Sequence, residues 1–89
     1  MDEKIKSVIE KKISETLEDS DTISKLNNSF ENLSKSKRDF CNGIIIGRLY
    51  NSFYYQTRRI LHRNPSDQEF SEFLTMIQKY EKNLQELNF

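Results

Sequence analysis

The chain has 89 residues, enough for one small domain but too few for a large hydrophobic core. Ala, Val, Ile, Leu, Met, Phe, Trp, Cys and Gly together make up 29 of the 89 residues, about 33%, whereas these types make up about 45–50% of a typical globular domain. Its 14 basic and 14 acidic residues balance, which argues mildly against a free-standing nucleic-acid binder with the usual basic excess.

The first predicted helix covers residues 2–18. Apolar residues recur at steps of three and four from Ile5 to Leu17, with Lys and Glu between them. Asp2 and Glu3 fall in the first turn, where the helix dipole favours acidic side chains. Because charges run through the whole segment, it does not resemble a secretory signal. We therefore expect a cytoplasmic protein.

A second helical pattern extends over residues 21–62, and its continuity has two interpretations. Ser36 and Asp39 form a weak capping box that would open a new helix. No Gly or Pro interrupts residues 20–42, however, and the apolar period continues in phase through Phe40 and Ile44. The stretch is therefore either one long helix or two helices broken near residues 34–36.

The last predicted helix covers residues 66–87 and has the clearest start. Pro65 cannot continue a helix, and it pushes Asn64 out of helical geometry. Ser66 and Glu69 then form the S-x-x-E capping box. We expect a single all-α domain over residues 1–89, a small antiparallel bundle of three or four helices that contains one long central helix in the continuous alternative.

Residues 40–63 combine an apolar and a basic surface, and no acidic residue occurs from Phe40 to Ser66. On a helical wheel one face of this segment is apolar and predicts a packing or dimer face. Two glycines four residues apart on this face allow another backbone to approach closely, either within the chain or from a second subunit. The predicted interaction residues are Gly43, Gly47, Tyr50, Phe53 and Tyr54.

The opposite face of residues 48–63 carries a basic stripe. Arg suits phosphate and carboxylate oxygens, and Tyr can stack on a base. The alternative is a solvated face neutralised by acids of the last helix such as Glu69 and Glu72. The predicted polyanion-binding residues are Arg48, Tyr55, Arg58, Arg59, His62 and Arg63.

The sequence offers no site for catalysis, a cofactor or a metal. Cys41 is the only cysteine, so it forms no intrachain disulfide, and on a continuous helix it lies about 31 Å from His62, the only histidine. No other residues supply a metal-ligand spacing. We expect Cys41 to be a small apolar filler.

These patterns favour a non-catalytic helical interaction or adaptor protein. The small number of apolar residues available for the core favours a homodimer, since a second copy would supply the missing apolar surface. The alternative is a nucleic-acid-binding regulator that uses the basic stripe on DNA or RNA, and a third option is an acidic protein partner. The longest apolar run, Ile44–Ile46, is far shorter than the roughly 20 residues of a membrane span, so we expect no membrane partner.

Overall fold

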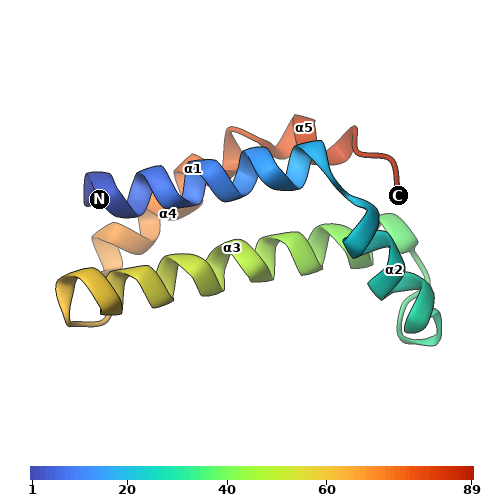
Figure 1. Ribbon diagram of the computed structural model, residues 1–89, viewed down its shortest axis with the longest axis horizontal. Helices are drawn as coiled ribbons and strands as arrows, with labels where there is room; N and C mark the ends of the chain where they lie inside the picture. Colours follow the sequence, from blue (N-terminus) through green and yellow to red (C-terminus); the bar gives the residue numbers. More distant parts are fainter.

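The computed structural model describes all 89 residues and contains helices and turns but no strand, which confirms the all-α prediction (Figure 1). Five helices and one 3₁₀ turn, η1, follow one another along the chain. Their bounds are α1 Glu3–Glu18, α2 Asp21–Ser29, η1 Glu31–Leu33, α3 Lys37–Leu61, α4 Asp67–Gln78 and α5 Glu81–Gln85.

The bundle is built along α3, the longest helix. α1 lies beside α3 and runs in the opposite direction, while α4 lies behind α1 in the view of Figure 1. α2 and η1 project at one end of α3, and the α3–α4 turn forms the other end. The molecule measures 38 × 22 × 19 Å, so α3 runs along most of its length.

The helical conformation is interrupted between α2 and α3, so residues 21–62 do not form one continuous helix. Ser34 and Ser36 are both extended, with ψ of 145° and 112°. The Ser34 hydroxyl donates to the Ser36 carbonyl and accepts from the Ser36 N–H, which holds the backbone in a local turn. The Ser36 hydroxyl then accepts from the N–H of Asp39 and caps α3.

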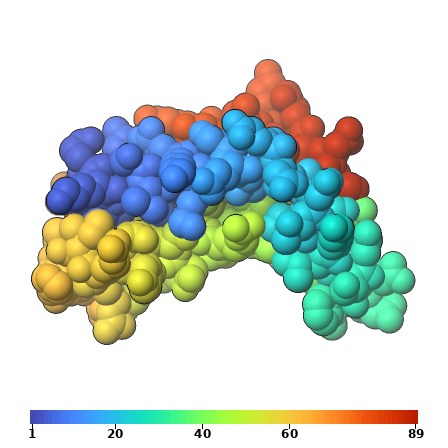
Figure 2. All heavy atoms as spheres, viewed as in Figure 1, coloured from blue at the N-terminus to red at the C-terminus, as the bar shows by residue number.

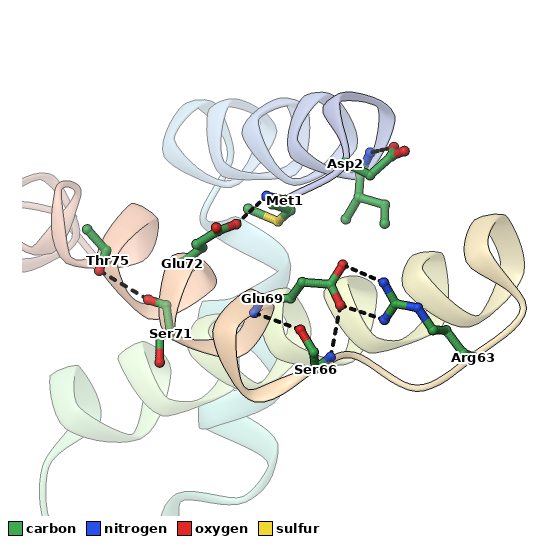
Figure 3. A network of polar contacts seen from close by, with 9 residues as sticks. Met1, Asp2, Arg63, Ser66, Glu69, Ser71, Glu72 and Thr75 are labelled. Atoms are coloured by element: carbon green, nitrogen blue, oxygen red, sulfur yellow. Dashed lines mark hydrogen bonds and ion pairs between the residues drawn. The ribbon is translucent and has the colours of Figure 1, made fainter.

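The turn between α3 and α4 is held by polar contacts from both sides (Figure 3). His62 ends α3 in the left-handed conformation at φ 59°. Ser66 and Glu69 form the predicted capping box, each side chain accepting from the other residue's backbone N–H. Arg63 donates to both carboxylate oxygens of Glu69, at 2.6 and 3.2 Å.

The helix expected over residues 66–87 is divided in the structure into α4 and α5. The N–H of Tyr80 donates to the carbonyl of Ile77, three residues back, at 2.9 Å, so the helix tightens and ends. No Gly or Pro marks this point. The break turns α5 so that Leu84 enters the core and Leu87 packs against it.

The core lies where α1, α3 and α4 meet. α1 and α3 each contribute a row of side chains spaced four residues apart, and the rings of Phe53 and Phe73 stack with their centroids 4.7 Å apart. Twelve hydrophobic side chains are buried: Ile5, Ile9, Ile13, Ile23, Cys41, Ile45, Leu49, Phe53, Phe73, Met76, Ile77 and Leu84.

Two buried threonines form their hydrogen bonds within their own helices. Thr16 and Thr57 each donate their hydroxyl to the carbonyl four residues back, at 2.8 Å, so neither leaves its hydroxyl proton unpaired. No helix of the structure combines the length and the apolar character that crossing a membrane requires.

Candidate interaction surfaces

The two sides of α3 have different surroundings. Its buried side is the row Cys41, Ile45, Leu49, Phe53 and Thr57, which faces the other helices. Most of the remaining circumference is exposed. The candidate surfaces are therefore the apolar and the basic parts of this uncovered circumference.

The first surface surrounds Gly43 and Gly47, both of which are exposed. A Cβ atom added to either glycine would meet no atom within 4 Å, so no helix of the same chain approaches them. The alternative of close packing within the chain is thus wrong. The two glycines instead leave open space on the outside of α3.

Exposed apolar side chains of α3 and α4 lie around this open space. Tyr50 contacts Phe70 edge to face, with ring centroids 5.9 Å apart, and both rings are partly exposed, at 44% and 38%. Ile46 and Leu74 are 40% and 44% exposed. We call this surface the glycine face; it consists of Gly43, Ile46, Gly47, Tyr50, Phe70 and Leu74.

One of the predicted interaction residues, Phe53, does not lie on an exposed surface. Phe53 is only 1% exposed and belongs to the core, so it is not available to another molecule. Tyr54 is half-buried and lies next to Tyr50, with ring centroids 6.3 Å apart. A helical wheel describes one helix without its neighbouring helices, so it placed these residues together on one apolar arc. In the structure, α1 and α4 determine which part of that arc is covered.

The outline of the molecule is hollowed beneath the middle of α3 (Figure 2). The hollow lies between the α3–α4 turn and the projecting α2–η1 segment. The tip of that segment is also apolar, since Leu26, Phe30 and Leu33 are 40%, 51% and 73% exposed. Ile23, Leu26, Phe30 and Leu33 recur at steps of three and four, but only Ile23 is buried within the chain.

The basic stripe is neutralised at its C-terminal end. The hydrogen bonds from Arg63, followed by those from Ser66, lower the pKa of Glu69 from its ordinary 4.5 to about 2, and the same contact raises the pKa of Arg63. His62, the other residue at this end, adopts the left-handed C-cap conformation. Arg63 is thus part of the turn and is not a free cation.

The remaining arginines of the stripe have no carboxylate partner. Glu69 is occupied by Arg63, and Glu72 pairs with the amino group of Met1 (Figure 3). The third ion pair of the structure joins Lys11 and Glu15, at 4.0 Å. The predicted neutralisation by the last helix therefore applies to Arg63 and to none of Arg48, Arg58 and Arg59.

Two shallow hollows bring lysines of α1 beside these arginines, and a third hollow, on α3 alone, adjoins both. Lys12 lines one hollow with Arg48, and Lys4 lines another with Arg59. The third contains Tyr55, Arg58 and Arg59, and it shares Asn51 with the first and Arg59 with the second. No acidic residue lines any of the three. We call the cations Lys4, Lys12, Arg48, Arg58 and Arg59 the basic band.

Sequence reasoning missed Lys4 and Lys12. The two residues are eight positions apart, about 80° around α1, which places them on one side of the helix. Similar spacings occur among the other lysines of α1, so nothing in the sequence singles these two out. Only the packing of α1 against α3 shows which lysines border the arginines.

Cys41 is fully buried, as expected for an apolar filler. Burial raises the pKa of its thiol, and its Sγ lies 3.9 Å from the carbonyl oxygen of Ile23. No group of three His, Cys, Asp or Glu side chains is arranged to hold a metal ion. Comparison with protein-family models, curated proteins and solved structures found no match.

Proposed function

We propose that the protein is a non-catalytic interaction module that forms a homodimer through the glycine face. The observation that carries the proposal is the open space above Gly43 and Gly47, bordered by exposed apolar side chains. Glycine costs about 1 kcal/mol relative to alanine in a helix. This cost has no compensation within the chain, whereas close approach of another helix would supply one.

A second copy fits this surface because the surface complements itself. In a two-fold dimer each copy presents the same patch, so a useful patch contains both a depression and a projection. The glycines form the depression, and Ile46 and Tyr50 project beside it. Two copies of α3 that cross here could bring their axes to the short end of the usual 8–10 Å range.

The charge of the glycine face also suits self-association. Any charge on a two-fold axis meets a charge of its own sign in the other copy. None of the six residues of the glycine face carries a charge. The whole chain is neutral as well, so long-range repulsion between two copies is small.

The size of a stable interface indicates which further residues take part. Such an interface buries about 800 Å² on each partner, roughly one eighth of this molecule's 6256 Å². The α2–η1 segment, which lies at one side of the hollow, carries the exposed residues Leu26, Phe30 and Leu33 and would extend the contact beyond the glycine face. We also propose that the dimer acts in the cytoplasm, where the lone thiol of Cys41 stays reduced.

The decisive experiment measures mass by light scattering across a dilution series. We expect twice the 10.7 kDa of the chain at micromolar protein. Gly47→Leu should yield a monomer, because a leucine at this position has open space in one chain but would clash across the interface. Ser14→Leu adds the same side chain on an exposed position of α1 and should leave the dimer intact.

A monomeric mass for the unchanged protein at all concentrations would contradict the proposal. So would a dimer that tolerates Gly47→Leu, since the contact would then lie elsewhere. Circular dichroism of each variant should retain the helical spectrum, which separates loss of association from loss of folding.

A further inference from the structure

The groove between α1 and α3 carries a surface that dimerisation does not explain. Lys4, Lys12, Arg48 and Arg59 of the basic band line the two hollows of this groove, and Arg58 lies in the adjoining hollow on α3. None of these five cations forms an ion pair with a carboxylate. No acidic residue lines the three hollows, although the whole protein has zero net charge. A local positive field can therefore exist on a neutral molecule.

The carboxylate nearest to Lys12 in helical register belongs to Glu15, three residues further along α1. Glu15 lines none of the three hollows, and its carboxylate lies 4.0 Å from the exposed Lys11. The hollow that contains Lys12 and Arg48 is otherwise lined by Thr16, Ser52 and other uncharged residues. A negatively charged ligand would thus meet two cations and hydroxyl groups there, without a competing acid.

Aromatic rings interrupt the cations in the middle of the band. Tyr55 is 59% exposed, and it lines the same hollow as Tyr54, Arg58 and Arg59. Surfaces that bind single strands combine cations along the phosphate backbone with aromatic rings on which bases stack. An acidic peptide that is bound through charge alone would not need the exposed ring of Tyr55 among these arginines.

The shape of the band favours a single strand over a duplex. Arg48 and Arg59 are 11 residues apart, so the band extends about 16 Å along α3 and can contact several phosphates. Helices that read a duplex project into its major groove. α3 does not project in this way, because α1 lies along it beside the band.

We propose that the groove between α1 and α3 binds single-stranded nucleic acid, with the basic band on the phosphates and Tyr55 stacked on a base. This inference does not depend on the homodimer, because every residue of the band belongs to one chain. In a dimer the band would be present twice.

The test measures fluorescence anisotropy of a labelled oligouridylate of about 16 nucleotides, the upper end of a typical single-strand site. With five phosphate contacts, the logarithm of the association constant should fall against the logarithm of salt concentration with a slope of about −3.5. An unlabelled duplex of equal length and polyglutamate should compete weakly.

Substitutions test whether binding depends on the basic band or on positive charge anywhere on the surface. Arg58→Gln combined with Arg59→Gln should reduce the salt slope by about 1.4, and Lys12→Gln by about 0.7. The matched control is Lys25→Gln with Arg38→Gln, which removes two exposed cations that line none of the three hollows and should leave binding nearly unchanged. Tyr55→Ala should weaken binding about 5- to 100-fold at constant charge.

Three results would overturn the inference: no binding of the oligouridylate at low salt, equal losses in the control variant, or binding unaffected by Tyr55→Ala. Competition by polyglutamate as strong as by the oligonucleotide would assign the band to an acidic protein instead. Tighter binding of the duplex would contradict the single-strand proposal. Repeating the titration with Gly47→Leu separates this inference from the dimer, since the monomer should still bind.

Discussion

Ile45 and Ile46 are identical neighbours on α3, yet one belongs to the core and the other to the surface. Ile45 is 1% exposed and lies in the row that faces the other helices, whereas Ile46 is 40% exposed on the glycine face. The comparison shows that α3 carries more apolar surface than the chain can cover. The covered part stabilises the bundle, and the uncovered part is available for association.

Alanine substitutions at these two positions give the largest expected contrast. Ile45→Ala should lower the free energy of unfolding by about 2–5 kcal/mol, because it leaves a cavity in a closed core. Ile46→Ala, measured at a protein concentration where the chain is monomeric, should cost less than about 1 kcal/mol. Urea denaturation of both variants measures the difference. Equal losses would mean that the glycine face is covered within the monomer.

The α3–α4 turn holds Phe73 against Phe53, so weakening its cap should loosen the covered side of α3. Ser66→Ala removes the hydroxyl that accepts from the Glu69 N–H, and it should cost about 1 kcal/mol. Ser36→Ala, at the cap of the other end of α3, is the matched comparison. If neither serine substitution lowers the stability, the caps do not hold the bundle together.

Acid should weaken the same turn. The folded-state pKa of Glu69, about 2, lies below its ordinary 4.5, so the carboxylate stabilises the fold above pH 4.5. This contribution should be lost progressively as the pH falls from 4.5 towards 2. Denaturation curves of Glu69→Gln should lack this part of the pH dependence, and those of Arg63→Gln should retain only the part due to Ser66. An unchanged acid profile in both variants would contradict the assignment.

Substitutions on the open side of α3 should raise the stability of the monomer instead of lowering it. Gly43→Ala and Gly47→Ala should each stabilise the monomer by about 0.8–1 kcal/mol, because alanine is the better helix former and its methyl group has free space. Thermal unfolding at low protein concentration measures the gain. A loss of stability would indicate an unseen neighbour within the chain.

The α2–η1 tip should be the least sensitive region. Leu33 is 73% exposed, so Leu33→Ser should change the monomer's free energy of unfolding by no more than about 0.5 kcal/mol. The same variant should weaken the dimer if the tip extends the interface. Comparing unfolding with the mass measured at several concentrations separates the two effects.

Much of the architecture follows from local rules. Pro65 and the capping pair Ser66 and Glu69 predict the start of α4, and the structure contains the full capping box. The spacing of Ile5, Ile9 and Ile13 predicts the buried side of α1. These features depend on residues within one or two turns of each other, so neighbouring sequence is sufficient.

Other features depend on contacts between distant residues. No residue near Tyr80 breaks a helix by itself, and the division between α4 and α5 places Leu84 in the core. The two serines at 34 and 36 left both alternatives open, and the structure resolves them through the hydrogen bonds between those serines. Local propensity is too weak to settle such cases, because tertiary packing contributes comparable free energy.

For this chain the sequence alone determined the helical class, the cap at Ser66 and an acid-free segment that carries both an apolar and a basic surface. Only the tertiary structure decided that Gly47 is open while Phe53 is buried, that Arg63 is neutralised, and that Lys12 lines a hollow with Arg48. The physical reason is that periodicity specifies angles around one helix, whereas exposure and pairing depend on which other helices lie at those angles.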